Sequence, residues 1–192
     1  MPHSLLQRGM KNKHRYRSSF QKICLLLIAL GLFCNTGFVP AALLAAEQAP
    51  NGHVVYLVRH AERADDSPDS ALSEKGRLRA DTLARLLGEA SISQIYSTDT
   101  RRTRATAQPL AEALQLPITE YPASELASLA ATLMTLDHNA LVVGHSNTTP
   151  QLARLLGIRA VQEISELEYD RLYIVVLAAG KPVADSVLRY GQ

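Results

Sequence analysis

One stretch of the sequence decides the fold: Val55-Tyr56-Leu57-Val58-Arg59-His60-Ala61-Glu62-Arg63. Its apolar start is typical of a strand that is buried on both faces, and such strands belong to parallel sheets covered by helices. The apolar run ends abruptly at Arg59 and His60. Because α/β proteins bind ligands at the carboxyl ends of their parallel strands, we expect these two side chains to lie at a functional site.

The residues that follow alternate between strand and helix patterns, which predicts an α/β layer fold. We expect strands at residues 53–58, 92–96, 118–121, 140–144 and 171–177, with an edge strand over 181–190. Apolar stripes predict four helices. Ser73 caps the first, whose buried face combines Leu83, Leu86, Leu87 and Ala90; Thr149 caps the last, with Pro150 in its first turn. Residues 64–71 predict a loop near the site.

The pair Arg59 and His60 suits phosphoryl chemistry. An arginine offers a rigid fork of donors that matches phosphate oxygens. A neutral histidine offers a nucleophilic ring nitrogen near pH 7. The stretch therefore predicts attack on a phosphoryl group whose charge is held by the neighbouring arginine.

Three further segments strengthen this interpretation. An arginine-rich turn, 97–107, follows the second expected strand, residues 141–147 end a third apolar run in Gly144-His145, and 72–77 read Leu-Ser-Glu-Lys-Gly-Arg. With the opening stretch, and in this order, they resemble the histidine phosphatase (phosphoglycerate mutase-like) superfamily over roughly residues 53–190. The resemblance implies a three-layer sandwich with a central, mostly parallel sheet flanked by helices.

The resemblance also implies roles for four residues. His60 is the nucleophile and forms a covalent phosphohistidine, which water hydrolyses in a second step. Arg59 and Arg102 clamp the oxygens of the transferring group, and His145 donates to one of them. The spacing to Thr106-Ala107 selects Arg102 over Arg101 and Arg104.

The general acid is less well defined. Family members often carry a glutamate after the third strand, where this chain offers Glu120 and Glu125, and it remains open that neither serves. Other branches place an aspartate directly after the second histidine, where this chain has Ser146. Glu62 either orients Arg59, meets the substrate or is a solvated charge.

We expect no metal and no cofactor, because the sequence shows neither metal-ligand spacing nor a glycine-rich phosphate or dinucleotide loop. The expected partner is a small phosphorylated molecule. The whole chain has a net charge of +2, but all 18 acidic and only 14 of the 20 basic residues lie in 47–192, a net of about −4 by counting. The basic balance therefore belongs to the first 46 residues, and nucleic-acid binding is not implied.

Residues 1–46 follow an export pattern: a basic segment, an apolar core over 23–33 and small residues before Glu47. The core is too short to span a bilayer alone, which favours a signal peptide, although residues 23–46 left uncut could anchor the chain. We therefore expect two parts, the leader 1–46 and the domain 47–192, and a periplasmic or extracellular location, free or membrane-anchored. Both cysteines lie in the leader.

The favoured function is an exported phosphatase that acts on a phosphomonoester or a phosphohistidine-type group. One alternative is a phosphotransferase of the phosphoglycerate mutase type, which the short spacing of 42 residues between Arg102 and His145 disfavours. The other is a catalytically inactive phosphate-binding module, which the presence of all four site residues disfavours. The sequence leaves the natural substrate and the oligomeric state open.

Overall fold

The computed structural model describes residues 52–191. In chain order its elements are β1 (His53–Arg59), α2 (Glu74–Leu87), β2 (Ile92–Ser97), α3 (Arg101–Leu114), β3 (Ile118–Glu120), α4 (Leu126–Met134), β4 (Asn139–Gly144), α5 (Thr148–Leu155), β5 (Arg171–Ala178) and β6 (Lys181–Arg189). The five expected strands and the edge strand are confirmed, with ends that differ by one residue.

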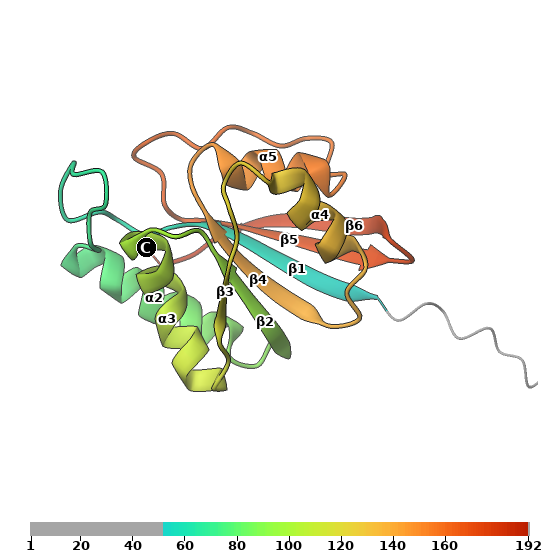
Figure 1. Ribbon diagram of the computed structural model, residues 1–192, viewed down its shortest axis with the longest axis horizontal. Helices are drawn as coiled ribbons and strands as arrows, with labels where there is room; N and C mark the ends of the chain where they lie inside the picture. The colour runs from blue at the N-terminus through green and yellow to red at the C-terminus, as the bar shows by residue number, and fades with distance from the viewer. Residues whose placement is uncertain (1–51, 192) are drawn as a thin grey trace, which may run out of the picture. The chain divides into compact units, whose positions relative to one another are not determined.

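The six strands form one sheet in the order β3-β2-β4-β1-β5-β6. The first four are parallel to one another, β5 runs antiparallel to β1, and β6 runs antiparallel to β5. β1, which ends at Arg59, therefore lies inside the sheet with a neighbour on each side (Figure 1). This position explains its continuous apolar run, and the mostly parallel sheet is confirmed.

Helices cover both faces of the sheet, as Figure 1 shows, with α2 and α3 on one face and α4 and α5 on the other. Alternate strand residues point to opposite faces. On β4, Leu141 packs in the cluster with residues of α2 and α3, whereas Val142 packs in the cluster with residues of α4 and α5. The three-layer sandwich is confirmed, with one apolar core on each side of the sheet.

Three local predictions were wrong. α5 begins at Thr148 after Asn147, so Thr149 lies inside the helix, where its Oγ1 donates to the Val58 carbonyl oxygen at 3.2 Å. Leu86 is 48% exposed, because the buried stripe of α2 is narrower than the sequence pattern. The arginine-rich turn is helical from Arg101, because the Thr100 side chain caps the backbone N–H of Thr103.

The predicted leader, residues 1–46, lies outside the described residues. Between residues 52 and 191, no helix combines the length and the apolar character needed to cross a membrane.

Candidate active site

Strand register brings the site together. Arg59 is paired with Gly144 across β1 and β4, and Ser97 is paired with Val143 across β2 and β4. The residues that follow these strands therefore meet at one edge of the sheet, and the backbone N–H of His60 donates to the Gly144 carbonyl oxygen at 2.9 Å. A side chain in place of Gly144 would press on the Thr148 hydroxyl, 2.9 Å from its Cβ. Glycine thus permits the close approach of α5 to the strand end.

The two histidines face each other across this edge. The rings of His60 and His145 lie 5.5 Å apart between centroids and 67° apart between planes. Nδ1 of His60 donates to the carbonyl oxygen of Ala61 at 2.8 Å, because a carbonyl can only accept. In the neutral ring the proton is therefore on Nδ1, and Nε2 carries the lone pair. Thr98 Oγ1 lies 2.9 Å from Nε2 of His145 and orients that ring.

Both imidazoles are held neutral. Burial lowers the pKa of His60 to about 3, helped by the charges of Arg59, Arg102 and His145 and opposed by the Ala61 hydrogen bond. Burial and the charges of Arg102 and Arg59 lower the pKa of His145 to about 4. His60, only 3% exposed, is thus neutral near pH 7, the form in which an imidazole is nucleophilic.

Arg59 is buried and clasped by the segment between α5 and β5. Its Nη1 donates to three backbone carbonyl oxygens, those of Ser165, Glu166 and Glu168, at 2.8–3.1 Å. Its guanidinium stacks on the ring of Tyr169, with the central carbon 4.2 Å from the ring centroid. These contacts fix the guanidinium beside His60 before any substrate arrives.

Two guanidinium N–H groups at the site have no partner within residues 52–191. They are Nε of Arg59 and Nε of Arg102, and both atoms are buried. Arg102 is held by a hydrogen bond from its Nη1 to the Pro68 carbonyl oxygen at 2.9 Å. Buried donors are normally satisfied, so two unpaired charged ones beside neutral histidines suit an anion such as a phosphoryl group.

The amino-terminal half of α3 is hydrogen-bonded to the chain just after His60. Thr106 Oγ1 accepts from the backbone N–H of Ala61 at 2.9 Å and donates to the Arg102 carbonyl oxygen at 2.7 Å. A second contact lies at Gly76 in α2, where an added Cβ would come within 2.3 Å of the Glu62 carbonyl oxygen. These contacts give a structural reason for Thr106 and Gly76, two residues of the sequence motifs.

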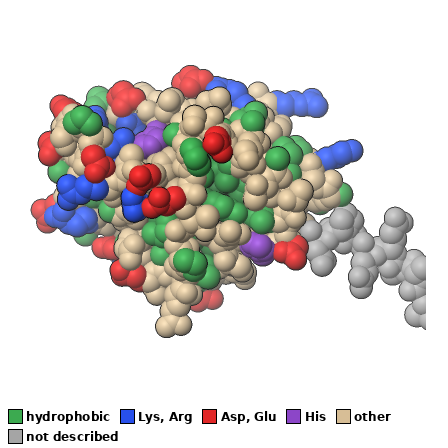
Figure 2. All heavy atoms as spheres, viewed as in Figure 1, with side chains coloured by type: hydrophobic (Ala, Val, Ile, Leu, Met, Phe, Trp, Pro, Cys, Tyr) green, Lys and Arg blue, Asp and Glu red, His purple; other side chains and the backbone are tan. Residues whose placement is uncertain are grey.

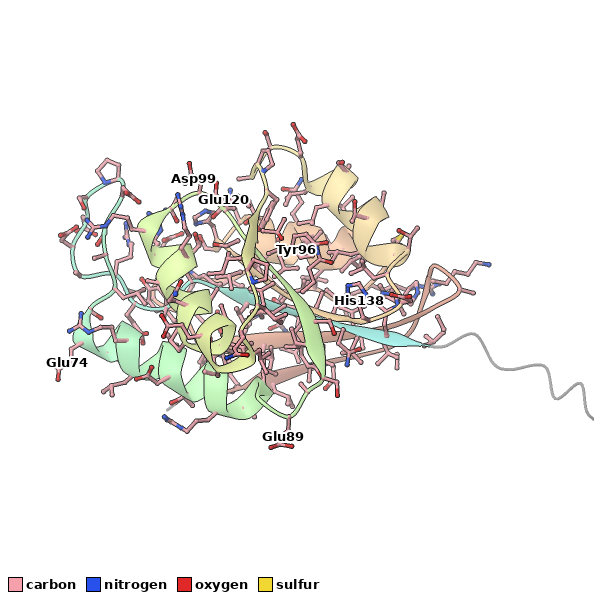
Figure 3. The ribbon with its side chains drawn as sticks, turned by 60° about the horizontal axis from the view of Figure 1, so that its bottom comes forward. Glu74, Glu89, Tyr96, Asp99, Glu120 and His138 are labelled. Atoms are coloured by element: carbon pink, nitrogen blue, oxygen red, sulfur yellow. The ribbon has the colours of Figure 1, made fainter. Side chains whose placement is uncertain are left out.

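The two predicted acids have partners or surroundings other than the histidines. Glu120 pairs with Arg104 at 2.8 Å, and Arg104 also pairs with Asp99, which lies next to Glu120 in Figure 3. Glu125 is exposed at the start of α4 and makes no side-chain capping bond. Across residues 52–191, neither Glu120 nor Glu125 hydrogen-bonds to the site arginines or histidines.

Glu62 also has other partners. Its carboxylate accepts two hydrogen bonds from the Arg79 guanidinium, from Nη2 at 2.8 Å and from Nε at 2.9 Å, and Lys75 Nζ lies 3.4 Å from Glu62 Oε1. Burial opposes ionisation of Glu62, but the hydrogen bonds and charge of Arg79 outweigh it and lower the pKa of Glu62. The structure gives Glu62 no contact with Arg59, and its role toward substrate stays a prediction.

Sequence reasoning missed the segment 157–170, which brings a glutamate into the site. Glu166 Oε2 lies 2.9 Å from Nη2 of Arg59, and Glu166 Oε1 accepts from the Ser146 hydroxyl at 2.7 Å. The only available signal in the sequence was the length of this segment, since long connections without secondary structure are often functional.

Figure 2 shows Lys and Arg side chains gathered near the amino-terminal end of α3, with acidic side chains between them.

No group of three or more His, Cys, Asp or Glu in the described part of the chain is arranged to hold a metal ion. The groups that converge on the site are two guanidinium groups, two imidazoles and the carboxylate of Glu166. The unpaired guanidinium donors suit the binding of an anion such as a phosphoryl group at this edge of the parallel sheet.

Comparison with known proteins shows what the chain is similar to. The sequence profile of the histidine phosphatase superfamily, branch 1, matches residues 55–125, the segment that holds Arg59, His60 and Arg102. The chain is therefore similar to this superfamily over that segment. A search of curated proteins finds no match to the sequence.

Solved structures share the fold. A SixA protein histidine phosphatase bound to tungstate is 18% identical, and the match covers 71% of this chain and 96% of that one with a TM-score of 0.61. YhfR of Bacillus stearothermophilus is 15% identical over 73% and 97%, with a TM-score of 0.58. A mycobacterial glucosyl-3-phosphoglycerate phosphatase is 15% identical over 73% and 99%, with a TM-score of 0.57, and has also been solved with inorganic phosphate.

Proposed function

We propose that the protein is a phosphatase that hydrolyses a phosphomonoester or a phosphohistidine-type group through a phosphohistidine at His60. The observation that carries the proposal is the pair of buried, unpartnered Nε–H groups of Arg59 and Arg102 beside two neutral imidazoles. Donors fixed in advance where phosphoryl charge gathers are the main contribution a protein makes to this reaction.

In the first step, Nε2 of His60 forms a bond to phosphorus, and the bond to the leaving oxygen or nitrogen breaks. The electron pair of that bond goes to the leaving group, which takes up a proton. In the second step, the oxygen of a water molecule bonds to phosphorus, the N–P bond breaks, and the water releases a proton. Arg59, Arg102 and His145 hold the phosphoryl oxygens in both steps.

The test is turnover of a panel of phosphate esters and a phosphoramidate by the purified full-length chain, with a chelator present. We expect inorganic phosphate release that survives the chelator and that His60→Ala reduces by at least 10³-fold, within the range known for catalytic groups. A folded wild-type chain that releases no phosphate from any member would contradict the proposal and favour a binding module. Turnover that persists in His60→Ala would contradict the role of His60.

We further propose that residues 1–46 direct export, which places the domain in the periplasm or outside the cell. The basic start, the apolar core over 23–33 and the small residues before Glu47 support this proposal. Fractionation of expressing cells and sequencing of the mature amino terminus test it. A chain beginning at Glu47 outside the cytoplasm, or an intact chain in the membrane, agrees with the proposal; an intact chain in the cytosol contradicts it.

A further inference from the structure

The reaction proposed above needs a proton for the leaving group, and the basic groups of the site do not supply it. Arg59 and Arg102 remain charged because guanidinium groups do not deprotonate in proteins. His60 and His145 are neutral, so each has one ring proton: that of His60 is held by the Ala61 carbonyl oxygen, and that of His145 serves to hold a phosphoryl oxygen in the function proposed above. A carboxyl group is therefore required at the anion site if the leaving group is a poor one.

Most nearby carboxylates are committed elsewhere. Glu62 is held by Arg79, and Glu120 is held by Arg104. Asp69, which lies near Arg102, accepts from the backbone N–H of Arg101 at 2.8 Å. None of them touches Arg59.

Glu166 is the carboxylate that contacts the site in the described residues. It bridges Nη2 of Arg59 and the hydroxyl of Ser146, the residue that follows His145. Nε and Nη2 of Arg59 lie on the same edge of the guanidinium group, and Nε has no partner in the described structure. A phosphoryl oxygen that accepts from Nε therefore lies beside the Glu166 carboxylate. The Glu166 side chain is 71% exposed, so it can also reach solvent and an entering leaving group.

We propose that Glu166 is the proton-transfer residue of this phosphatase, and that the enzyme is suited to phosphate monoesters of aliphatic alcohols. The inference rests on the function proposed above. The protonated carboxyl of Glu166 gives its proton to the leaving alkoxide oxygen as the P–O bond breaks. In the second step the Glu166 carboxylate takes a proton from the water that attacks phosphorus, so each cycle restores the starting state. Ser146 holds the carboxylate in place.

The charges around Glu166 permit this cycle. The Ser146 hydrogen bond, helped by the charges of Arg59 and Arg63 and opposed by burial, lowers the pKa of Glu166 when the site holds no anion. A phosphate dianion beside the carboxylate places two like charges together, which raises the pKa again and favours proton uptake. The other charged groups around it are few: His145 across the site is neutral, and Glu168 on the same segment is paired with Arg171.

The test compares Glu166→Gln with wild type on two esters, p-nitrophenyl phosphate and β-glycerophosphate. The amide can keep the contacts with Arg59 and Ser146 but cannot donate a carboxyl proton. The nitrophenolate leaves without a proton, whereas the glycerol alkoxide needs one. We expect kcat/KM, which reports the step that breaks the P–O bond, to fall 10²–10⁴-fold on β-glycerophosphate, the usual contribution of general acid–base catalysis, and less than 10-fold on p-nitrophenyl phosphate. Glu163→Gln is the matched control. Glu163 is an exposed glutamate on the same segment as Glu166 and pairs with Arg154 of α5, so the substitution should leave both rates unchanged.

Each outcome separates this inference from the proposed function. Equal losses of kcat/KM on both esters would show that Glu166 only positions Arg59, and equal kcat/KM and kcat in Glu166→Gln and wild type would remove it from the reaction. A loss confined to the alkyl ester in Glu120→Gln or Glu125→Gln would assign the acid to that residue instead. A wild-type chain that cleaves the aryl ester but not the alkyl ester would overturn the inference and leave the phosphatase standing. A wild-type chain that cleaves neither and forms no phosphoenzyme would contradict the proposed function itself.

Discussion

His60 and His145 lie edge to face, 5.5 Å apart between ring centroids, at the ends of two adjacent parallel strands. Their separation follows from strand register, because the residues just before them, Arg59 and Gly144, are paired partners in the sheet. The sheet thus sets the distance between the proposed nucleophile and the proposed phosphate-binding histidine. The same arrangement places both rings in a buried, positively charged surrounding that keeps them neutral.

The low pKa values of these histidines make the stability of the fold pH-dependent. Both values lie below the ordinary value of 6.5, so between about pH 6.5 and pH 3 the unfolded chain binds more protons than the folded one. The free energy of unfolding therefore falls as the pH is lowered through this range. We expect the fall between pH 7 and pH 4.5, measured by urea unfolding, to be smaller by about 2 kcal/mol in His60→Asn than in wild type. Identical slopes in the two proteins would show that His60 is not held neutral by the fold.

The choice of Arg102 among three neighbouring arginines can be tested directly. Arg102→Ala removes one of the two unpartnered donors, and losses of this kind reduce kcat by about 10²–10³-fold. Arg101→Ala is the matched control, because the Arg101 side chain is exposed and is not among those with a buried, unpaired donor in the described residues. Steady-state kinetics on p-nitrophenyl phosphate should show the loss in Arg102→Ala alone. The reverse pattern would mean that the spacing argument selected the wrong arginine.

Thr106, in α3, accepts a hydrogen bond from the backbone N–H of Ala61, just after His60. Removal of the Thr106 hydroxyl should therefore lower the stability of the fold. Thr106→Val leaves the buried N–H of Ala61 without its acceptor, which typically costs about 1–3 kcal/mol. The control is Thr82→Val, since Thr82 is partly exposed on α2 and its hydroxyl donates to the Leu78 carbonyl oxygen and accepts from Nη2 of the exposed Arg85. Urea unfolding at pH 7 measures both. Equal effects of the two substitutions would indicate that the Ala61 N–H finds another partner.

Sequence alone predicted the framework because that framework is encoded locally. The apolar run ending at Arg59 and the Ser73 cap follow from residue periodicity and capping chemistry. The prediction that Leu86 is buried was wrong, because periodicity gives the direction of an apolar stripe and not its width. The helical start of the arginine-rich stretch could not be predicted, because three polar arginines leave no apolar periodicity in the first turn after the Thr100 cap.

The contact between Arg59 and Glu166 could not be predicted, since it joins residues 107 positions apart through a segment without periodicity. The partners of Glu62 and Glu120 were missed for a similar reason. From the sequence, any arginine could pair with these carboxylates. The packing of α2 against the residues after His60 selects Arg79 as the partner of Glu62, and the position of α3 beside β3 selects Arg104 as the partner of Glu120. Side-chain partners set by tertiary packing are thus the part of the site that the sequence leaves open.

The most direct test of the account is to trap and locate the phosphoenzyme. The full-length chain would be mixed with p-nitrophenyl [³²P]phosphate, quenched in alkali, where phosphohistidine survives, and mapped by peptide sequencing. The account predicts label on His60 that acid releases, and no label in His60→Ala. Turnover of the ester without any label on His60, or label on another residue, would contradict it.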